Sequence, residues 1–272
     1  MRAWARRHQL GTHLLLAPLG LLVAGPFFWM IGTALKTREE TALLSPWPAH
    51  PQWQNFAAAW HAAPFARYFL VSGLTAGAVT AAVVVSALLA GYAFGALRWR
   101  GQKTVFMVYL STMMVPFEVI LIPNFLSIQR LGWTDSFAAL IVPWAANVFS
   151  IFLVTQAFRS LPRDFHEAAL LDGCGHVQYL WRIAGPLVAP ALATAAIFAF
   201  LGSWNSLLWP VIVINSQSMR TAEMGLSMFL QEEQTEYHLL MAASLLCLLP
   251  VLALFLAMQR RFIEGLAAGL KG

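Results

Sequence analysis

Residues 167–190 read EAALLDGCGHVQYLWRIAGPLVAP, and the interpretation of the whole chain starts from this polar segment. Phe165, Ala168 and Ala169 recur at helical spacing, which predicts a short amphipathic helix. The helix should end at Gly173, because glycine readily adopts the left-handed conformation that closes a helix. The segment therefore predicts a helix that stops abruptly in a polar stretch.

A second short helix is expected after the glycine. Its apolar positions follow the spacing i, i+3, i+4 and i+7, at Val177, Leu180, Trp181 and Ala184. Pro186 should end it before the next apolar run. Two short helices joined at a glycine make a rigid projection. It could lie on lipid headgroups, but the alanines and acidic edge of the first helix favour a groove in another protein.

The composition predicts a polytopic membrane protein. Of 272 residues, 59% are hydrophobic and 11% are charged, and the mean hydropathy is +0.66. Cys174 and Cys247 are too few and too far apart for a disulfide framework, and we expect neither a disulfide nor a metal site. The net charge of +5 comes from small groups scattered at the ends of apolar runs, which does not indicate nucleic-acid binding.

Six segments are apolar enough and, at about 20 residues or more, long enough to cross a bilayer. We expect an all-α protein with transmembrane helices at Leu14–Leu35, Phe69–Leu97, Thr104–Ile128, Ser136–Phe158, Pro186–Ile214 and Leu239–Met258. The first is longer than the apolar core of a cleaved signal peptide. An even number of helices places both termini on one side of the membrane.

Basic residues predict which side that is. Twelve of the 17 Lys and Arg residues lie in the N-terminus, the turn at residues 98–103, the loop around the polar segment and the C-terminal tail. Because cytoplasmic loops are enriched in Lys and Arg, both termini and the polar segment should face the cytoplasm. The expected organisation is a cytoplasmic N-terminus at residues 1–13 and a transmembrane domain at 14–272, with a loop at 159–185 and a cytoplasmic tail at 259–272.

Two further features concern packing. Residues 36–67 combine tryptophans and prolines, which suits either a folded interfacial cap or a plain loop with tryptophans at the membrane surface. The second apolar segment carries Gly73 and Gly77, then Gly91 and Gly95, at spacings that allow helices to approach closely.

The polar segment resembles the EAA loop of ABC importer membrane subunits, in which EAA, three residues and glycine precede a distal isoleucine and proline. The resemblance implies a coupling helix that fits a cleft on an ATPase subunit, with its role carried by Glu167, Ala168, Ala169, Asp172, Gly173, Ile183 and Pro186. The tail QRRFIEGLAAGLKG and the stretch GSWNSLLWP are similar to the second membrane subunit of maltose-type and glycerol-phosphate-type importers. Cys174 and Gly185 depart from the usual alanine and leucine.

The family implies a multi-pass permease in the inner (plasma) membrane of a prokaryote. Its implied partners are a homologous second permease, two ATPase subunits, an extracytoplasmic binding protein and membrane lipid, with no nucleic acid. The sequence has no Walker A loop, so ATP and Mg should be used by the partner ATPase, and this chain should have no catalytic residue and no cofactor of its own. The expected solute is a sugar or oligosaccharide, and the alternative is glycerol phosphate or a polyol. A membrane enzyme and a proton-driven carrier are less favoured, because clustered catalytic residues and further buried ionisable groups are missing.

Three residues are candidates for the translocation path. Glu118 is the one charged residue within the expected spans and stands between prolines, so it either faces a water-filled path or pairs with groups that those prolines leave free. Trp204 and Asn205 offer an aromatic face and an amide in mid-helix, which suits a sugar, although Asn205 could instead bond a neighbouring helix. The histidines lack the spacing of metal ligands.

Overall fold

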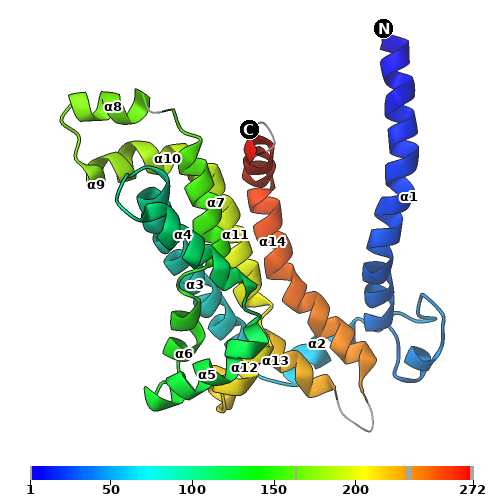
Figure 1. Cartoon of the computed structure of the whole chain (residues 1–272). Coiled ribbons are helices and arrows are strands. Elements are labelled where there is room, and N and C mark those ends of the chain that lie inside the picture. The colour runs from blue at the N-terminus through cyan, green and yellow to red at the C-terminus, as the bar shows by residue number, and fades with distance from the viewer. Residues whose placement is uncertain (1, 163, 231–234, 270–272) are drawn as a thin grey trace. The chain divides into compact units, whose positions relative to one another are not determined.

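The computed structural model describes residues 2–162, 164–230 and 235–269. Every regular element in these ranges is a helix, which confirms the all-α class (Figure 1). The chain divides into two compact units, Met1–Phe65 with Leu226–Leu249, and Ala66–Gly225 with Pro250–Gly272.

The first unit contains the long helix α1 and a folded connection. Its elements are α1 (Arg2–Ala34), η1 (Glu39–Ala42), α2 (Gln54–His61), η6 (Ser227–Phe229) and the start of α14 (Tyr237–Gly269). In the connection, Asn55 is buried and its Nδ2 donates to the carbonyl oxygens of Ala34 at 2.9 Å and Lys36 at 2.8 Å. The Lys36 Nζ donates to the carbonyl oxygen of Ser45 and lies 5.0 Å from the Trp29 ring centroid. Residues 36–65 therefore form a folded connection, and the placement of this connection at the membrane surface stays a prediction.

The second unit is a bundle of longer and shorter helices. Its elements are α3 (Phe65–Gly95), α4 (Gln102–Ser111), η2 (Thr112–Met114), α5 (Phe117–Arg130), α6 (Phe137–Ile141), η3 (Val142–Trp144), α7 (Val148–Arg159), α8 (Asp164–Leu171), α9 (His176–Tyr179), η4 (Leu180–Ala184), α10 (Gly185–Leu187), α11 (Ala189–Trp204), α12 (Leu208–Val213), η5 (Gln217–Met219) and α13 (Ala222–Leu226). Figure 1 shows α7 and α11 side by side, and these two helices make extensive contact.

Among the described residues, three helices are long and apolar enough to cross a membrane without a break. They are Leu16–Ala34, Phe65–Gly95 and Tyr237–Ala257, and they correspond to the first, second and sixth expected spans. Up to six spans result if each of three bent helix pairs counts as one. The described helices thus agree with the expected layout in number but not in continuity.

The expectation of unbroken third, fourth and fifth spans is wrong. The third consists of Gln102–Met114 and Phe117–Arg130, which meet at 99°, because Pro116 has an extended conformation and lacks the N–H that would continue the helix. The fourth bends by 41° before α7, where the Asn147 side chain caps the new helix by accepting from the Ser150 N–H.

The fifth span begins later than expected. A helix from residue 176 to 187 runs through Pro186, and it meets α11 at 79°. Leu180–Ala184 is a π-helix, in which the Gly185 N–H bonds to the Leu180 carbonyl. The wider turn makes room for the Pro186 ring, which would clash with the carbonyl four residues earlier in an α-helix. Pro186 therefore does not end the short helix; the break comes at Val188.

Helices α3 and α7 pack closely at two glycines. A Cβ atom at Gly91 would lie 2.7 Å from the Val154 Cγ1, and one at Gly95 would lie 2.5 Å from the Phe158 Cβ. These glycines confirm the close approach expected from their spacing. Gly73 and Gly77 have no such neighbour among the described residues of this chain.

Candidate functional site

The turn after α8 has the geometry expected at Gly173. Gly173 has φ +73°, the Cys174 N–H donates to the Ala169 carbonyl at 2.9 Å, and the Asp172 N–H donates to the Ala168 carbonyl at 3.1 Å. The bond from Cys174 back over five residues is the one that closes a Schellman motif. The predicted helix, glycine break and helix are confirmed. We call α8, this turn and residues 176–187 the knuckle.

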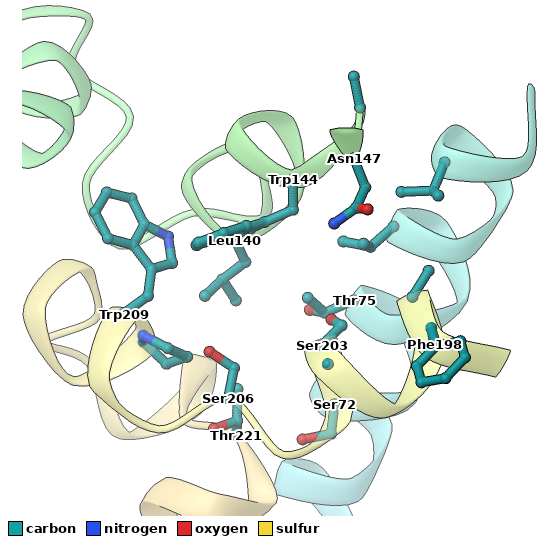
Figure 2. A pocket seen from close by; sticks show the side chains of 16 residues that line it. Ser72, Thr75, Leu140, Trp144, Asn147, Phe198, Ser203, Ser206, Trp209 and Thr221 are labelled. Atoms are coloured by element: carbon teal, nitrogen blue, oxygen red, sulfur yellow. The ribbon is translucent and has the colours of Figure 1, made fainter. Parts of the chain in front are cut away.

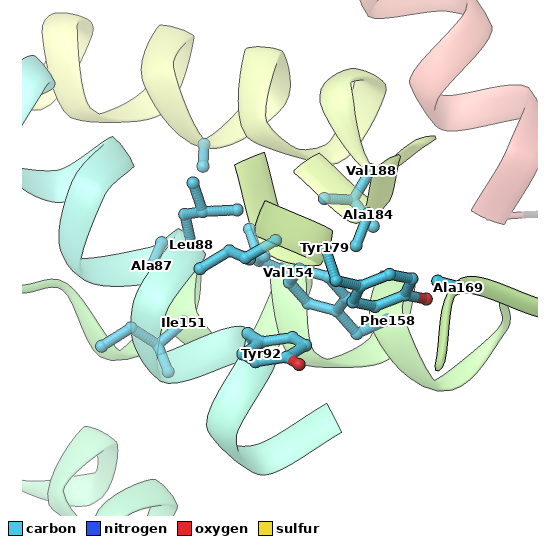
Figure 3. Packing of buried hydrophobic residues seen from close by; sticks show 12 residues of the cluster. Ala87, Leu88, Tyr92, Ile151, Val154, Phe158, Ala169, Tyr179, Ala184 and Val188 are labelled. Atoms are coloured by element: carbon cyan, nitrogen blue, oxygen red, sulfur yellow. The ribbon is translucent and has the colours of Figure 1, made fainter. Parts of the chain in front are cut away.

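The candidate coupling residues lie on different faces of the knuckle. Four of the candidate residues, all on the first half of the knuckle, are exposed: Glu167, Ala168, Asp172 and Gly173. Ala169 is buried in a cluster with residues of α3 and α7, and Ile183 packs against the same cluster (Figure 3). Pro186 is exposed. The knuckle therefore presents acidic residues, Ala168, Gly173 and the apolar side chains of Phe165 and Leu171 outward, and uses the second alanine of the motif for packing.

The apolar stripe expected on the second helix is half wrong. Leu180 and Ala184 are buried as expected, but Val177 is 72% exposed and Trp181 is 55% exposed. Tyr179 is buried in their place. Val177 and Trp181, four residues apart, share one side of the helix, and the side that packs against the bundle is instead the one that carries Tyr179 and Leu180.

Aromatic rings attach the knuckle to α3. The Tyr92 hydroxyl lies 2.9 Å from the His176 Nδ1, and the Tyr92 ring lies 6.1 Å from Tyr179 and 5.7 Å from Phe158 (Figure 3). The His166 ring meets Tyr179 edge-on at 4.8 Å. Both helices of the knuckle thus share one set of ring contacts with the bundle. Sequence reasoning missed Tyr92 because it lies about 75 residues before the knuckle, in an apolar helix where a tyrosine carries no distinguishing signal.

A cavity lined by both apolar and polar side chains lies within the second unit, at the other end of α11 from the knuckle. Its volume is about 210 Å³, and the 16 residues that line it come from α3, α6 to the start of α7, α11 to α12, and residue 221 (Figure 2). Five hydroxyl side chains and one amide are among them: Ser72, Thr75, Ser203, Ser206, Thr221 and Asn147. Trp144, Phe198 and Trp209 contribute aromatic rings. None of these described lining residues carries a formal charge.

Some of the polar groups around the cavity already have partners. The Ser72 Oγ accepts from the Ala222 N–H at 2.8 Å, and the Trp209 Nε1 donates to the Ala139 carbonyl at 2.9 Å. By contrast, the buried Thr75 Oγ1 has no hydrogen-bond partner among the described residues. The cavity therefore holds both structural and unused polar groups.

The residues proposed for the translocation path do not line this cavity. Glu118 is exposed in the first turn of α5, where a carboxylate complements the helix dipole. Trp204 is 3% exposed, with its ring 5.8 Å from Phe69 and 5.7 Å from Phe200. Asn205 is exposed and follows the last residue of α11, so the expectation of a mid-helix amide is wrong.

Loops outside the apolar helices hold their own polar network. The Asp135 Oδ1 accepts from the Asn215 N–H at 3.1 Å, the Ser216 N–H at 3.0 Å and the Ser216 hydroxyl at 2.9 Å. Hydrogen bonding from the Ser216 backbone lowers the pKa of the Asp135 carboxyl below its ordinary value. This carboxylate ties the loop before α6 to the loop after α12. No group of three or more possible metal ligands occurs in the part of the chain that the structure describes.

The family model described as "Binding-protein-dependent transport system inner membrane component" matches residues 82–267. The chain belongs to this family. The match includes the knuckle and α11, so the resemblance inferred from the EAA pattern is confirmed, and the chain is a permease component of an ABC importer.

Individual relatives share most of the chain. The sn-glycerol-3-phosphate transport system permease protein of Yersinia enterocolitica is 34% identical over 227 residues, covering 80% of this chain and 81% of that protein. The diacetylchitobiose uptake system permease protein of Streptomyces coelicolor is 29% identical over 270 residues, covering 97% and 89%. A bacterial ABC transporter involved in the import of alginate has the same fold, with a TM-score of 0.82 at 20% identity over 94% of this chain and 97% of that one.

Proposed function

We propose that this chain is one of two homologous membrane subunits of a carbohydrate importer, assembled with two ATPase subunits and an extracytoplasmic binding protein. The observation that carries the proposal is the knuckle, a short stiff element with an exposed acidic edge and ring contacts to the bundle. The matched family is described as binding-protein-dependent, which supports the binding protein as a partner.

The orientation is part of the proposal. Arg159 precedes the knuckle and Arg182 lies within it, and basic residues also cluster in the turn at residues 98–103. Since cytoplasmic loops carry the excess of Lys and Arg, the knuckle and both termini face the cytoplasm, where ATPase subunits operate. ATP and Mg are bound by those subunits.

In this mechanism the knuckle converts ATPase movement into movement of α11. Closure of the ATPase pair on ATP displaces the knuckle. Glu167 forms an ion pair with a basic side chain of the ATPase cleft, and the small side chain of Ala168 allows close contact with that cleft. The helix through Pro186 joins α11 at the bend after Leu187, so a displaced knuckle changes the position or tilt of α11. A bundle with two arrangements then opens alternately to the two sides.

The proposed solute is a sugar or oligosaccharide. The Streptomyces coelicolor relative is named for diacetylchitobiose uptake, which supports this class. The Yersinia enterocolitica relative is named for sn-glycerol-3-phosphate, and its 34% identity makes that solute the second candidate.

The test uses the complete complex in vesicles with ATP inside, and measures uptake of labelled diacetylchitobiose, ATP hydrolysis and retention of the ATPase subunits. Gly173→Trp should lose the ATPase subunits or hydrolyse ATP without uptake. Gly132→Trp is the matched control, because Gly132 also has a left-handed φ of +68°, open space around it and a following N–H that bonds back over five residues. The control should retain the ATPase subunits; normal uptake by Gly173→Trp would refute the coupling role.

A further inference from the structure

We propose that the cavity at the end of α11 binds one ring of a neutral carbohydrate, with Thr75 and Ser203 as direct hydrogen-bonding partners. This proposal rests on the proposed function, because it assigns the solute class and a contact site to this subunit. It differs from the expected path residues Trp204 and Asn205, which do not line the cavity.

The strongest evidence is the unsatisfied hydroxyl of Thr75. The side chain is 5% exposed and lines the cavity, yet its Oγ1 has no hydrogen-bond partner among the described residues. Threonines in helices commonly bond to a carbonyl four residues earlier, and Thr80 in the same helix does so, to Ala76 at 2.7 Å. A buried hydroxyl without a partner costs about 1–3 kcal/mol. Thr75 is therefore placed to bond a group that enters the cavity.

Other unused groups lie around the same space. The hydroxyls of Ser203 and Ser206 take part in none of the hydrogen bonds found among the described residues, and both residues are partly buried. Asn147 uses its Oδ1 to cap α7, accepting from Ser150 at 3.0 Å, which leaves its Nδ2 as a donor. Thr75 and Ser203 line the same cavity, and Figure 2 shows the Asn147 amide turned toward it. Hydroxyls that donate and accept, together with an amide donor, match the hydroxyls of a sugar.

The rest of the lining suits the apolar face of a sugar ring. Trp144 and Phe198 present aromatic surface, and Leu140 and Val79 add aliphatic surface. Binding sites for small molecules typically combine such an apolar lining with a few placed polar groups. The volume of about 210 Å³ is far above the roughly 10–15 Å³ that one water molecule needs, and it is below the range of about 300–1,000 Å³ for drug-sized ligands. One ring of a longer chain is an occupant of suitable size.

Charge decides between the two candidate solutes. No described lining residue is a Lys, Arg or His that could neutralise a phosphate. Moving an anion into such a site without a paired cation is costly. The cavity therefore favours a neutral carbohydrate over sn-glycerol-3-phosphate, although a relative is named for that compound.

The transport test compares Thr75→Val and Ser203→Ala with Thr80→Val in the complete complex. Loss of one hydrogen bond should raise the KM for diacetylchitobiose about threefold to tenfold in each cavity variant. Thr80→Val should leave KM unchanged, because that hydroxyl bonds its own helix outside the cavity. Unchanged KM and kcat in both cavity variants would mean that the cavity holds water only, and would overturn the proposal.

A binding test does not depend on transport. In the purified complex with Cys174→Ser, alkylation of Ser203→Cys should be slowed by diacetylchitobiose and unaffected by sn-glycerol-3-phosphate. Protection by the phosphate alone would overturn the neutral-sugar site while leaving the importer function intact. Protection by the sugar in a complex without ATP-driven uptake would support the site and refute the proposed function.

Discussion

The clearest quantitative prediction compares four glycines of α3, each changed to alanine. At Gly95 an added Cβ would lie 2.5 Å from the Phe158 Cβ and 2.8 Å from the Thr155 carbonyl oxygen, and at Gly91 it would lie 2.7 Å from the Val154 Cγ1. The Phe158 Cβ and the carbonyl cannot rotate away, so α3 and α7 must separate. At Gly73 and Gly77 no atom of the described residues lies within 4 Å of an added Cβ.

The magnitude follows from two opposing effects. Extra atoms in a packed interface cost about 1–3 kcal/mol, while alanine is favoured over glycine within a helix by about 0.5–1 kcal/mol. All four positions gain the helical preference, so it cancels in the comparison between the two pairs. The Gly91 and Gly95 variants should be less stable than the Gly73 and Gly77 variants by about 1–3 kcal/mol each.

The assay heats the purified chain in detergent to a series of temperatures and measures the fraction of protein that remains monodisperse at each one. At about 2–4 °C per kcal/mol for a chain of roughly this size, the two pairs should differ in midpoint by about 2–12 °C. Gly95→Ala should have the lowest midpoint, because one of its clashes is with backbone. Equal midpoints for Gly95→Ala and Gly73→Ala would refute the close packing of α3 on α7.

Two more predictions concern polar side chains that bond the backbone of the connections between helices. Asp135→Ala should lower the thermal midpoint at neutral pH more than Asp135→Asn, because asparagine keeps an acceptor for Ser216 and tolerates the residue's φ of 61°. The pKa of Asp135 is lower in the folded protein than its ordinary value of about 3.9. The ionised carboxylate therefore stabilises the folded state above that ordinary value, and this stabilisation is lost as pH falls through the lower folded pKa. Melting curves from pH 7 to 3 should show that the difference in midpoint between wild type and Asp135→Ala shrinks only at the acid end. Asn55→Ala should cost about 1–3 kcal/mol, because two carbonyls lose their buried donor. Gln54→Ala, at an exposed neighbour, should leave the midpoint unchanged, and equal effects of the two would contradict the capping role of Asn55.

The parts of the fold that the sequence predicted are those set by local backbone chemistry. Gly173 ends α8 because the left-handed conformation is available to glycine, and this needs no knowledge of the tertiary structure. The length of the apolar segments identified the three unbroken spans, and this criterion also needs no knowledge of the tertiary structure. The broken spans were missed although their cause, Pro116, was visible. Hydropathy averages over a window and does not register a change of direction.

The prediction of which residues are buried on the second helix of the knuckle was half wrong for a different reason. It took the side with Val177 and Trp181 as buried, whereas the bundle covers the side that carries Tyr179 and Leu180, and apolar spacing alone does not register a tyrosine as a core residue. The cavity was out of reach because its polar groups come from helices more than 100 residues apart, as with Thr75 and Ser203. In sequence, each is an ordinary hydroxyl in an apolar helix; only the tertiary structure shows that the Thr75 hydroxyl has no hydrogen-bond partner in the described part of the chain.

The knuckle and the cavity lie at opposite ends of one helix, which gives their relation a simple physical form. Helix α11 has 16 residues and, at about 1.5 Å per residue, is about 24 Å long, with the bend after the knuckle at its start and Ser203 in its last turn. Its packing against α7 holds it laterally, and α7 in turn carries Asn147 at the cavity. A shift of α11 along α7 therefore changes the separation of Ser203 and Asn147. In the proposed importer, ATP-driven movement of the knuckle would in this way weaken the hydrogen bonds from the cavity to a sugar ring, although no residue of the cavity contacts the ATPase.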